Sequence, residues 1–165
     1  MEIPFNVFDG AENGLINFIA NISPGYNLFS TTLKASGGDS YHFTHVAPAD
    51  QIPDLNQTLL AQANSAVQFS SLLGYATPGQ VAKVQVSTNA GAAWQDVYSQ
   101  AGAGSFTETV FSPRQVSLAA FAGQTGVEFF AVGIHDRTGA VQQALHHFAI
   151  RRLPGEQHGH QRVAG

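Results

Sequence analysis

The fold class is decided by the stretch Gln80-Val-Ala-Lys-Val-Gln-Val-Ser-Thr-Asn-Ala-Gly-Ala-Ala-Trp-Gln-Asp-Val-Tyr98. Its first half alternates: Ala82, Val84 and Val86 fall on one face and mostly polar residues on the other. This period of two is typical of a half-buried strand. A turn rich in small polar residues follows, and a second strand begins near Trp94. The stretch therefore predicts an antiparallel β-hairpin.

The turn of this hairpin is expected at Ser87, Asn89 and Gly91, because Asn and Ser side chains bond nearby backbone N–H groups and Gly adopts positive φ. The spacing Ser-x-Asn-x-Gly-x-x-Trp resembles the Asp-box, a hairpin motif of pattern Ser-x-Asp-x-Gly-x-Thr-Trp. Asn89 stands in for the acid and Ala93 for the Thr. The resemblance implies that the turn is structural, that it carries no chemistry, and that Trp94 anchors the core.

Composition favours a β-sandwich over a helical bundle. The chain has 165 residues, enough for one domain with a sizeable core. Only 11% of them are charged, against about 25% in an average soluble protein. With 12 Phe and 17 Gly, this suits sheets with uncharged polar faces better than helices whose exposed faces need Glu and Lys.

Charge and cysteine content exclude several classes of function. A formal net charge of −4 argues against nucleic acid or an anionic membrane as the partner. No apolar run approaches the ~20 residues that span a bilayer. The chain lacks cysteine, so disulfides, thiolate zinc sites and thiol nucleophiles are excluded.

Strand signals recur about ten residues apart, with turn residues between them, as in an antiparallel sandwich or barrel. We expect one such domain over residues 1–134. Residues 135–165 differ, because they hold four of the five arginines and five of the seven histidines. Val141, Ala144, Leu145 and Phe148 recur at helical spacing, which favours a helix over 139–153. Residues 154–165 are expected to be disordered.

Several segments together resemble a known group of domains: 56–60, 69–88, 94–98 and 116–124. The group comprises jelly-roll domains related to MAM and concanavalin A-like sandwiches, which are accessory modules of secreted bacterial peptidases and glycoside hydrolases. The resemblance covers roughly residues 5–132 and implies an all-β, antiparallel jelly-roll sandwich. It also implies an extracellular or periplasmic location.

In such modules an early acidic residue joins an acidic pair on the last strand to hold a structural Ca²⁺. Asp9 and Glu12 match the early half, whereas only Asp136 is present where the late pair belongs. The closing strand is then either formed from residues 145–150 or supplied by a second copy of the chain.

The N-terminus shows neither a basic segment nor an apolar segment of a signal peptide. Three readings stay open: the protein remains inside the cell, the chain begins after a removed signal, or it is a module of a larger protein.

Two sets of candidate residues involve metal or catalysis. Calcium prefers oxygen ligands on loops, and Asp9, Glu12, Asn13 and Asp39 are our candidate ligands, with Asp50 and Asp54 also in expected loops. A His–carboxylate pair can act as a general base in ester or lactone hydrolysis. The candidate pairs here are His42 with Asp39 and His45 with Asp50.

A third set of candidates is aromatic. A tyrosine ring can stack on a sugar while its hydroxyl bonds a polar group. The four tyrosines, all candidates for ligand binding, are Tyr26, Tyr41, Tyr75 and Tyr98.

The leading hypothesis is a non-catalytic module that binds carbohydrate or another extracellular polymer and holds structural calcium. One alternative is a small calcium-dependent hydrolase that uses the loop histidines and carboxylates. A second alternative is an assembly domain that forms a homodimer through an open sheet edge.

Overall fold

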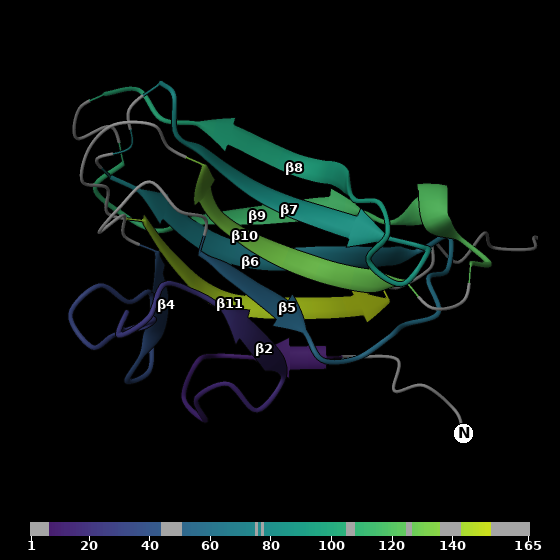
Figure 1. Ribbon diagram of the computed structural model, residues 1–165, viewed down its shortest axis with the longest axis horizontal. Helices are drawn as coiled ribbons and strands as arrows, with labels where there is room; N and C mark the ends of the chain where they lie inside the picture. The colour runs from purple at the N-terminus through teal and green to yellow at the C-terminus, as the bar shows by residue number, and fades with distance from the viewer. Residues whose placement is uncertain are drawn as a thin grey trace, which may run out of the picture.

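The computed structural model describes residues 7–43, 51–74, 76, 78–104, 108–124, 127–135 and 143–152, with only the backbone described in 128–135 and 143–152. The described strands form two antiparallel sheets that lie face to face (Figure 1). This arrangement confirms the predicted all-β sandwich of jelly-roll type. No helix among the described residues is long and apolar enough to cross a membrane.

The first sheet, sheet A, has the strand order β3-β4-β11-β6-β9, with β1 also paired to β11. Its strands are β1 (Val7–Asp9), β3 (Phe29–Ser30), β4 (Ser40–Phe43), β6 (Ser65–Leu73), β9 (Ser112–Ser117) and β11 (Gln143–Arg152). The second sheet, sheet B, has the order β2-β5-β10-β7-β8. Its strands are β2 (Phe18–Asn21), β5 (Ile52–Leu55), β7 (Val81–Ser87), β8 (Gln95–Ala101) and β10 (Glu128–His135). The 3-10 turn η1 (Ala119–Phe121) follows β9.

The core lies between the sheets and comes from alternate residues of the longer strands. In β6, Val67 and Phe69 are buried, and in β7 the buried residues include Val84 and Val86. Each fully buried side chain of this size contributes about 1.5–3 kcal/mol. The period-two pattern of the sequence therefore places the apolar face of each strand toward the other sheet.

Two aromatic contacts show which edges of the sheets face each other. Phe18 of β2 and Tyr41 of β4 pack edge to face, with ring centroids 5.3 Å apart. At the other side, Phe69 of β6 and Tyr98 of β8 pack in the same way at 5.1 Å. The edge strands β8 and β9 thus lie on the same side of the sandwich.

The predicted hairpin is formed by β7 and β8. The Oγ of Ser87 accepts from the N–H of Gly91 (2.9 Å), and the Oδ1 of Asn89 accepts from the N–H of Ala93 (2.8 Å). Gly91 has φ of 78°, as expected for the turn. Trp94 is half-buried rather than fully buried. The Asp-box relationship stays an interpretation, because these contacts explain the turn without it.

Of the two expectations for this segment, the helix over 139–153 is wrong and the closing strand from 145–150 is confirmed, because residues 143–152 form strand β11. This strand pairs with β6 from Leu73 to Ser65, with β4 over 143–145 and with β1 over 148–150. Backbone pairing on both sides outweighs a local helical spacing, since an interior strand satisfies its N–H and C=O groups in two ladders. The closing strand of sheet A therefore belongs to this chain.

The edge strands β8 and β9 are poorly suited to pairing with a second chain. Pro113 in β9 lacks an N–H group. In β8, Val84 pairs with Tyr98 and Gln85 with Asp96, so Val97 is an extra residue that forms a bulge. Prolines and bulges are typical protections of an edge. Dimerisation through a sheet edge stays a prediction, and these two strands do not favour it.

We expect the double variant Leu72→Cys with Ala144→Cys to form a disulfide on oxidation. The two residues are partners across β6 and β11, and the Cα separation of such partners suits the bond. The chain has no other thiol, so non-reducing electrophoresis and thiol titration measure the bond directly. The control is Leu72→Cys with Leu145→Cys, because residues 72 and 145 lie on opposite faces of the sheet. Equal bonding in both variants would contradict the strand.

Candidate functional site

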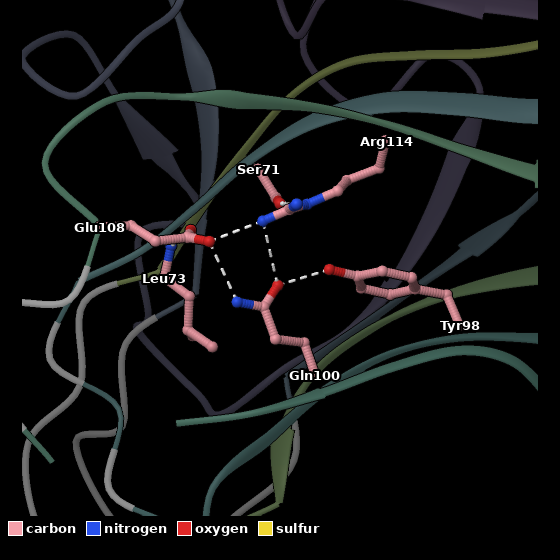
Figure 2. A network of polar contacts seen from close by, with 6 residues as sticks. All are labelled: Ser71, Leu73, Tyr98, Gln100, Glu108 and Arg114. Atoms are coloured by element: carbon pink, nitrogen blue, oxygen red, sulfur yellow. Dashed lines mark hydrogen bonds and ion pairs between the residues drawn. The ribbon is translucent and has the colours of Figure 1, made fainter. Parts of the chain in front are cut away.

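Polar side chains from both sheets meet where β8 and β9 face each other. We call this group the edge network, which consists of Ser71, Tyr98, Gln100, Glu108 and Arg114. Figure 2 shows the side chains of β6 and β9 pointing toward those of β8, with Glu108 closing the group from the loop before β9. The network therefore links the two sheets at their open edge.

Glu108 has three hydrogen-bond donors as partners. Its Oε1 accepts from Arg114 Nη2 at 2.6 Å and from Gln100 Nε2 at 3.0 Å. Its Oε2 accepts from the backbone N–H of Leu73 at 2.6 Å, at the end of β6. Three donors from two sheets fix this carboxylate, and hydrogen bonds to an ionised group are stronger than neutral ones.

Arg114 extends the network toward sheet B. Its Nε donates to Ser71 Oγ at 3.3 Å, and its Nη2 also lies 3.4 Å from Gln100 Oε1. The same Gln100 oxygen accepts from the Tyr98 hydroxyl. The side chains of Arg114 and Glu108 keep 28% and 16% of their surface exposed, so solvent or a ligand can reach them.

Burial raises the pKa of Tyr98, and the positive charge of Arg114 partly opposes this shift. The phenol is therefore neutral near pH 7 and donates its proton to Gln100. Its ring packs on Phe69, which holds the hydroxyl at the edge of the core. An aromatic body with a polar tip suits this boundary position.

Local sequence explains how these side chains are placed. In β9, residues 112, 114 and 116 share one phase of the strand, so Arg114 faces the same way as Val116. After β8 the chain passes close to Ala76, since a Cβ on Gly102 would lie 2.1 Å from the Ala76 carbonyl oxygen. This close approach requires glycine and fixes the start of the loop that carries Glu108.

The chemistry of the network favours binding over reaction. It offers a guanidinium, a carboxylate, an amide and the Tyr98 hydroxyl in a fixed arrangement, and the buried Ser71 hydroxyl holds the guanidinium. The carboxylate is engaged by three donors, and no thiol or imidazole belongs to the group. Such an array provides both donors and acceptors to a polar, uncharged ligand.

The predicted tyrosines do not form one site. Tyr41 is 2% exposed and does not offer a stacking face. Tyr26 is half-buried and its hydroxyl donates to the His42 carbonyl on β4. Strand β4 lies toward one side of the sandwich, and β8, which carries Tyr98, lies at the other side. Tyr75 lies outside the described residues. Of the four candidates, Tyr98 alone belongs to the edge network, and its role in binding stays a prediction.

The predicted calcium ligands Asp9 and Glu12 are engaged by hydrogen-bond donors. Asp9 Oδ1 accepts from the Ala11 N–H and the Tyr41 hydroxyl, both at 2.8 Å, and Oδ2 accepts from Asn17 Nδ2 at 2.8 Å. Glu12 accepts from the N–H groups of residues 38 and 39, at 2.9–3.2 Å.

These donors hold both carboxylates in place within the fold. Within the part of the chain that the structure describes, no three His, Asp or Glu side chains group closely enough to hold a metal. Asn13 is exposed in the turn after Glu12, and Asp39 is half-buried. Calcium binding stays a prediction that a thermal melt with Ca²⁺ and with EDTA measures.

The catalytic candidates are only partly described. His42 is half-buried in β4, and burial lowers its pKa, so the imidazole is neutral near pH 7. Asp39 directly precedes β4, and its N–H donates to Glu12. His45 and Asp50 lie outside the described residues. The hydrolase stays a prediction.

Sequence reasoning missed four members of the edge network: Ser71, Gln100, Glu108 and Arg114. One signal was present, because Arg114 occupies the same strand phase as apolar Val116 in a chain with few charges. A charge on the inward phase of an edge strand needs a partner. Glu108 and Gln100 carry no comparable signal, since only the packing of the two sheets brings them there.

Comparisons with known proteins agree with the fold. No protein-family model and no curated protein matches the sequence. Solved structures do match, although their sequences are only 10–14% identical. At this identity the likenesses show the fold alone.

The K3 cleaved adhesin domain of Lys-gingipain from Porphyromonas gingivalis superposes with a TM-score of 0.63, at 12% identity, covering 88% of this chain and 98% of that one. A family 22 xylan-binding domain from Paenibacillus barcinonensis gives 0.59, at 14% identity and 94% and 99% coverage. A family 22 carbohydrate-binding module from Clostridium thermocellum gives 0.57, at 10% identity and 88% and 92% coverage.

We expect Tyr41→Phe to lower the free energy of unfolding near pH 8 by about 1–3 kcal/mol, because the buried Asp9 carboxylate loses a donor. Burial, followed by the hydrogen bond to Asp9 and its charge, raises the pKa of Tyr41 above its ordinary value of about 10. Denaturant titrations measure the difference between the two proteins.

The sign of the pH dependence follows from linkage. Above pH 10 the unfolded chain loses the Tyr41 proton while the folded protein keeps it, so wild-type stability falls as the pH rises. The phenylalanine variant lacks this contribution, and the difference between the proteins shrinks from pH 8 to pH 11. A constant difference would contradict the buried, neutral phenol.

Proposed function

We propose that this chain is a non-catalytic carbohydrate-binding module and that the edge network is its ligand site. One observation carries the proposal: a guanidinium, a carboxylate, an amide and a phenol meet, partly exposed, beside an aromatic ring at the open edge of a β-sandwich. The proposal assigns binding to residues that also link the sheets.

Sugar recognition needs such a mixture of groups. Each sugar hydroxyl is both a donor and an acceptor, so a site must present both kinds of polar group in a fixed arrangement. The described contacts of Arg114 use Nε and Nη2. A guanidinium is a donor only, so the acceptors of the site come from its amide, carboxylate and phenol.

Preorganisation supports the same proposal. The hydrogen bonds from Glu108 to Leu73, Gln100 and Arg114 hold the polar side chains before a ligand arrives. Ordering a flexible side chain on binding costs about 0.5–1.5 kcal/mol. Side chains held in advance avoid much of that cost, which matters for a ligand whose hydroxyls are already well solvated.

The structural neighbours also support a glycan ligand. One is named as a xylan-binding domain, and another as a carbohydrate-binding module with ligand-binding residues in its cleft. The resemblance to accessory modules of secreted hydrolases supports an extracellular or periplasmic location, which we propose for this chain. The uncharged composition, with 11% charged residues, suits contact with a neutral polymer surface.

We expect Tyr98→Phe and Gln100→Ala each to weaken retention by a bound glycan about tenfold, because each removes a hydrogen-bonding group worth about 1 kcal/mol or more. Affinity electrophoresis in gels containing soluble xylan, followed by calorimetry, measures the change. The control is Lys83→Ala, which removes an ion pair with Asp96 on the outer face of the same two strands.

Retention that is unchanged in Tyr98→Phe and Gln100→Ala, together with lower melting temperatures, would make the network a structural tie and refute its role as the ligand site. A glycan array with the wild-type chain tests the broader proposal. Binding to no glycan on the array would sink the carbohydrate-binding function itself.

A further inference from the structure

We propose that Glu108 makes the edge network selective for neutral glycans, by cancelling the charge of Arg114 and excluding ligands that carry carboxylates. This inference rests on the proposed function and names the class of ligand for the same site. It concerns one charge pair, whose atoms lie 2.6 Å apart.

The charge balance of the network is the first step. Among the described residues, Arg114 and Glu108 are its charged members, and they pair directly. The Glu108 carboxylate takes the acceptor position that a uronic acid carboxylate would occupy on this guanidinium, since Arg binds carboxylates through its planar N–H groups. An acidic sugar would therefore meet an arginine that is already paired.

Repulsion is the second step. Two further donors, Leu73 N–H and Gln100 Nε2, hold Glu108 in place. The carboxylate therefore does not swing away from an approaching anion, and like charges at short range in a half-buried site repel strongly. The net charge of −4 on the whole chain opposes polyanions at longer range.

The side-chain groups of the network that remain available to a ligand are neutral. The Tyr98 hydroxyl and the Gln100 amide carry no charge, whereas the Ser71 hydroxyl is buried and serves to hold Arg114. These groups suit the hydroxyls of a neutral sugar. The guanidinium contributes hydrogen-bond donors, while its positive charge is balanced by the Glu108 carboxylate.

The test is Glu108→Gln, which removes the negative charge and keeps an oxygen acceptor of the same shape for Arg114. Affinity electrophoresis compares neutral xylan with polygalacturonate, at low and high salt. The wild-type chain is expected to be retained by xylan and not by polygalacturonate. The variant is expected to gain retention by polygalacturonate of about tenfold or more, and to lose the gain at high salt.

Two matched variants control the result. Asp96→Asn changes the net charge equally but lies on the outer face of sheet B, paired with Lys83, and is expected to shift retention within about twofold. Glu108→Gln with Arg114→Gln removes both charges and is expected to abolish the gain. An equal gain in Asp96→Asn, or no gain in a folded Glu108→Gln, overturns the inference.

A second measurement needs no variant. Wild-type retention is compared between polygalacturonate and the same polymer after reduction of its carboxyl groups to alcohols. Selectivity for neutral glycans predicts stronger retention by the reduced polymer, and equal retention by both overturns it. A different outcome tests the proposed function itself. If xylan, the reduced polymer and every glycan on the array all fail to retain the chain, the proposed function is wrong.

Discussion

The pairing of β11 is the constraint on which sheet A depends. This strand joins β6 on one side to β4 and β1 on the other. Without it the sheet would fall into separate pieces, each with unsatisfied backbone groups. The pairing also fixes the orientation of β6, so that Phe69 and Ser71 face sheet B. The edge network therefore depends on a strand that contributes no side chain to it.

The edge network combines support of the fold with partial exposure to solvent. A fully exposed ion pair would contribute about 0–1 kcal/mol, and a fully buried one would suffer a large desolvation cost. The Arg114–Glu108 pair lies between these limits, with 28% and 16% exposed. Its hydrogen bonds to both sheets hold it in one arrangement. A half-buried polar group of this kind is held rigidly and is still accessible from solvent.

The sequence predicts those parts of the structure that depend on neighbouring residues. The alternation in Val81–Ser87 and the turn at Ser87 and Asn89 specify the hairpin locally. The spacing in 139–153 favours a helix over the alternative closing strand from 145–150, because the pairing partners that make β11 a strand lie far away in the chain. The Tyr41–Asp9 hydrogen bond spans 32 positions, and the contact of Arg114 with Gln100 joins strands of two different sheets. Such contacts depend on how the two sheets pack, and the pattern of a single sequence does not indicate that packing.

The late position of β11 in the chain has a consequence for synthesis on the ribosome. Strands β1, β4 and β6 leave the exit tunnel well before the strand that joins them. At about 5–20 residues per second, their edges stay unpaired for several seconds. Sheet B also needs β10, which emerges shortly before β11. Sheet A can therefore close only after β11 has been synthesised, and until then the edges of β4 and β6 that β11 covers stay open to other partners.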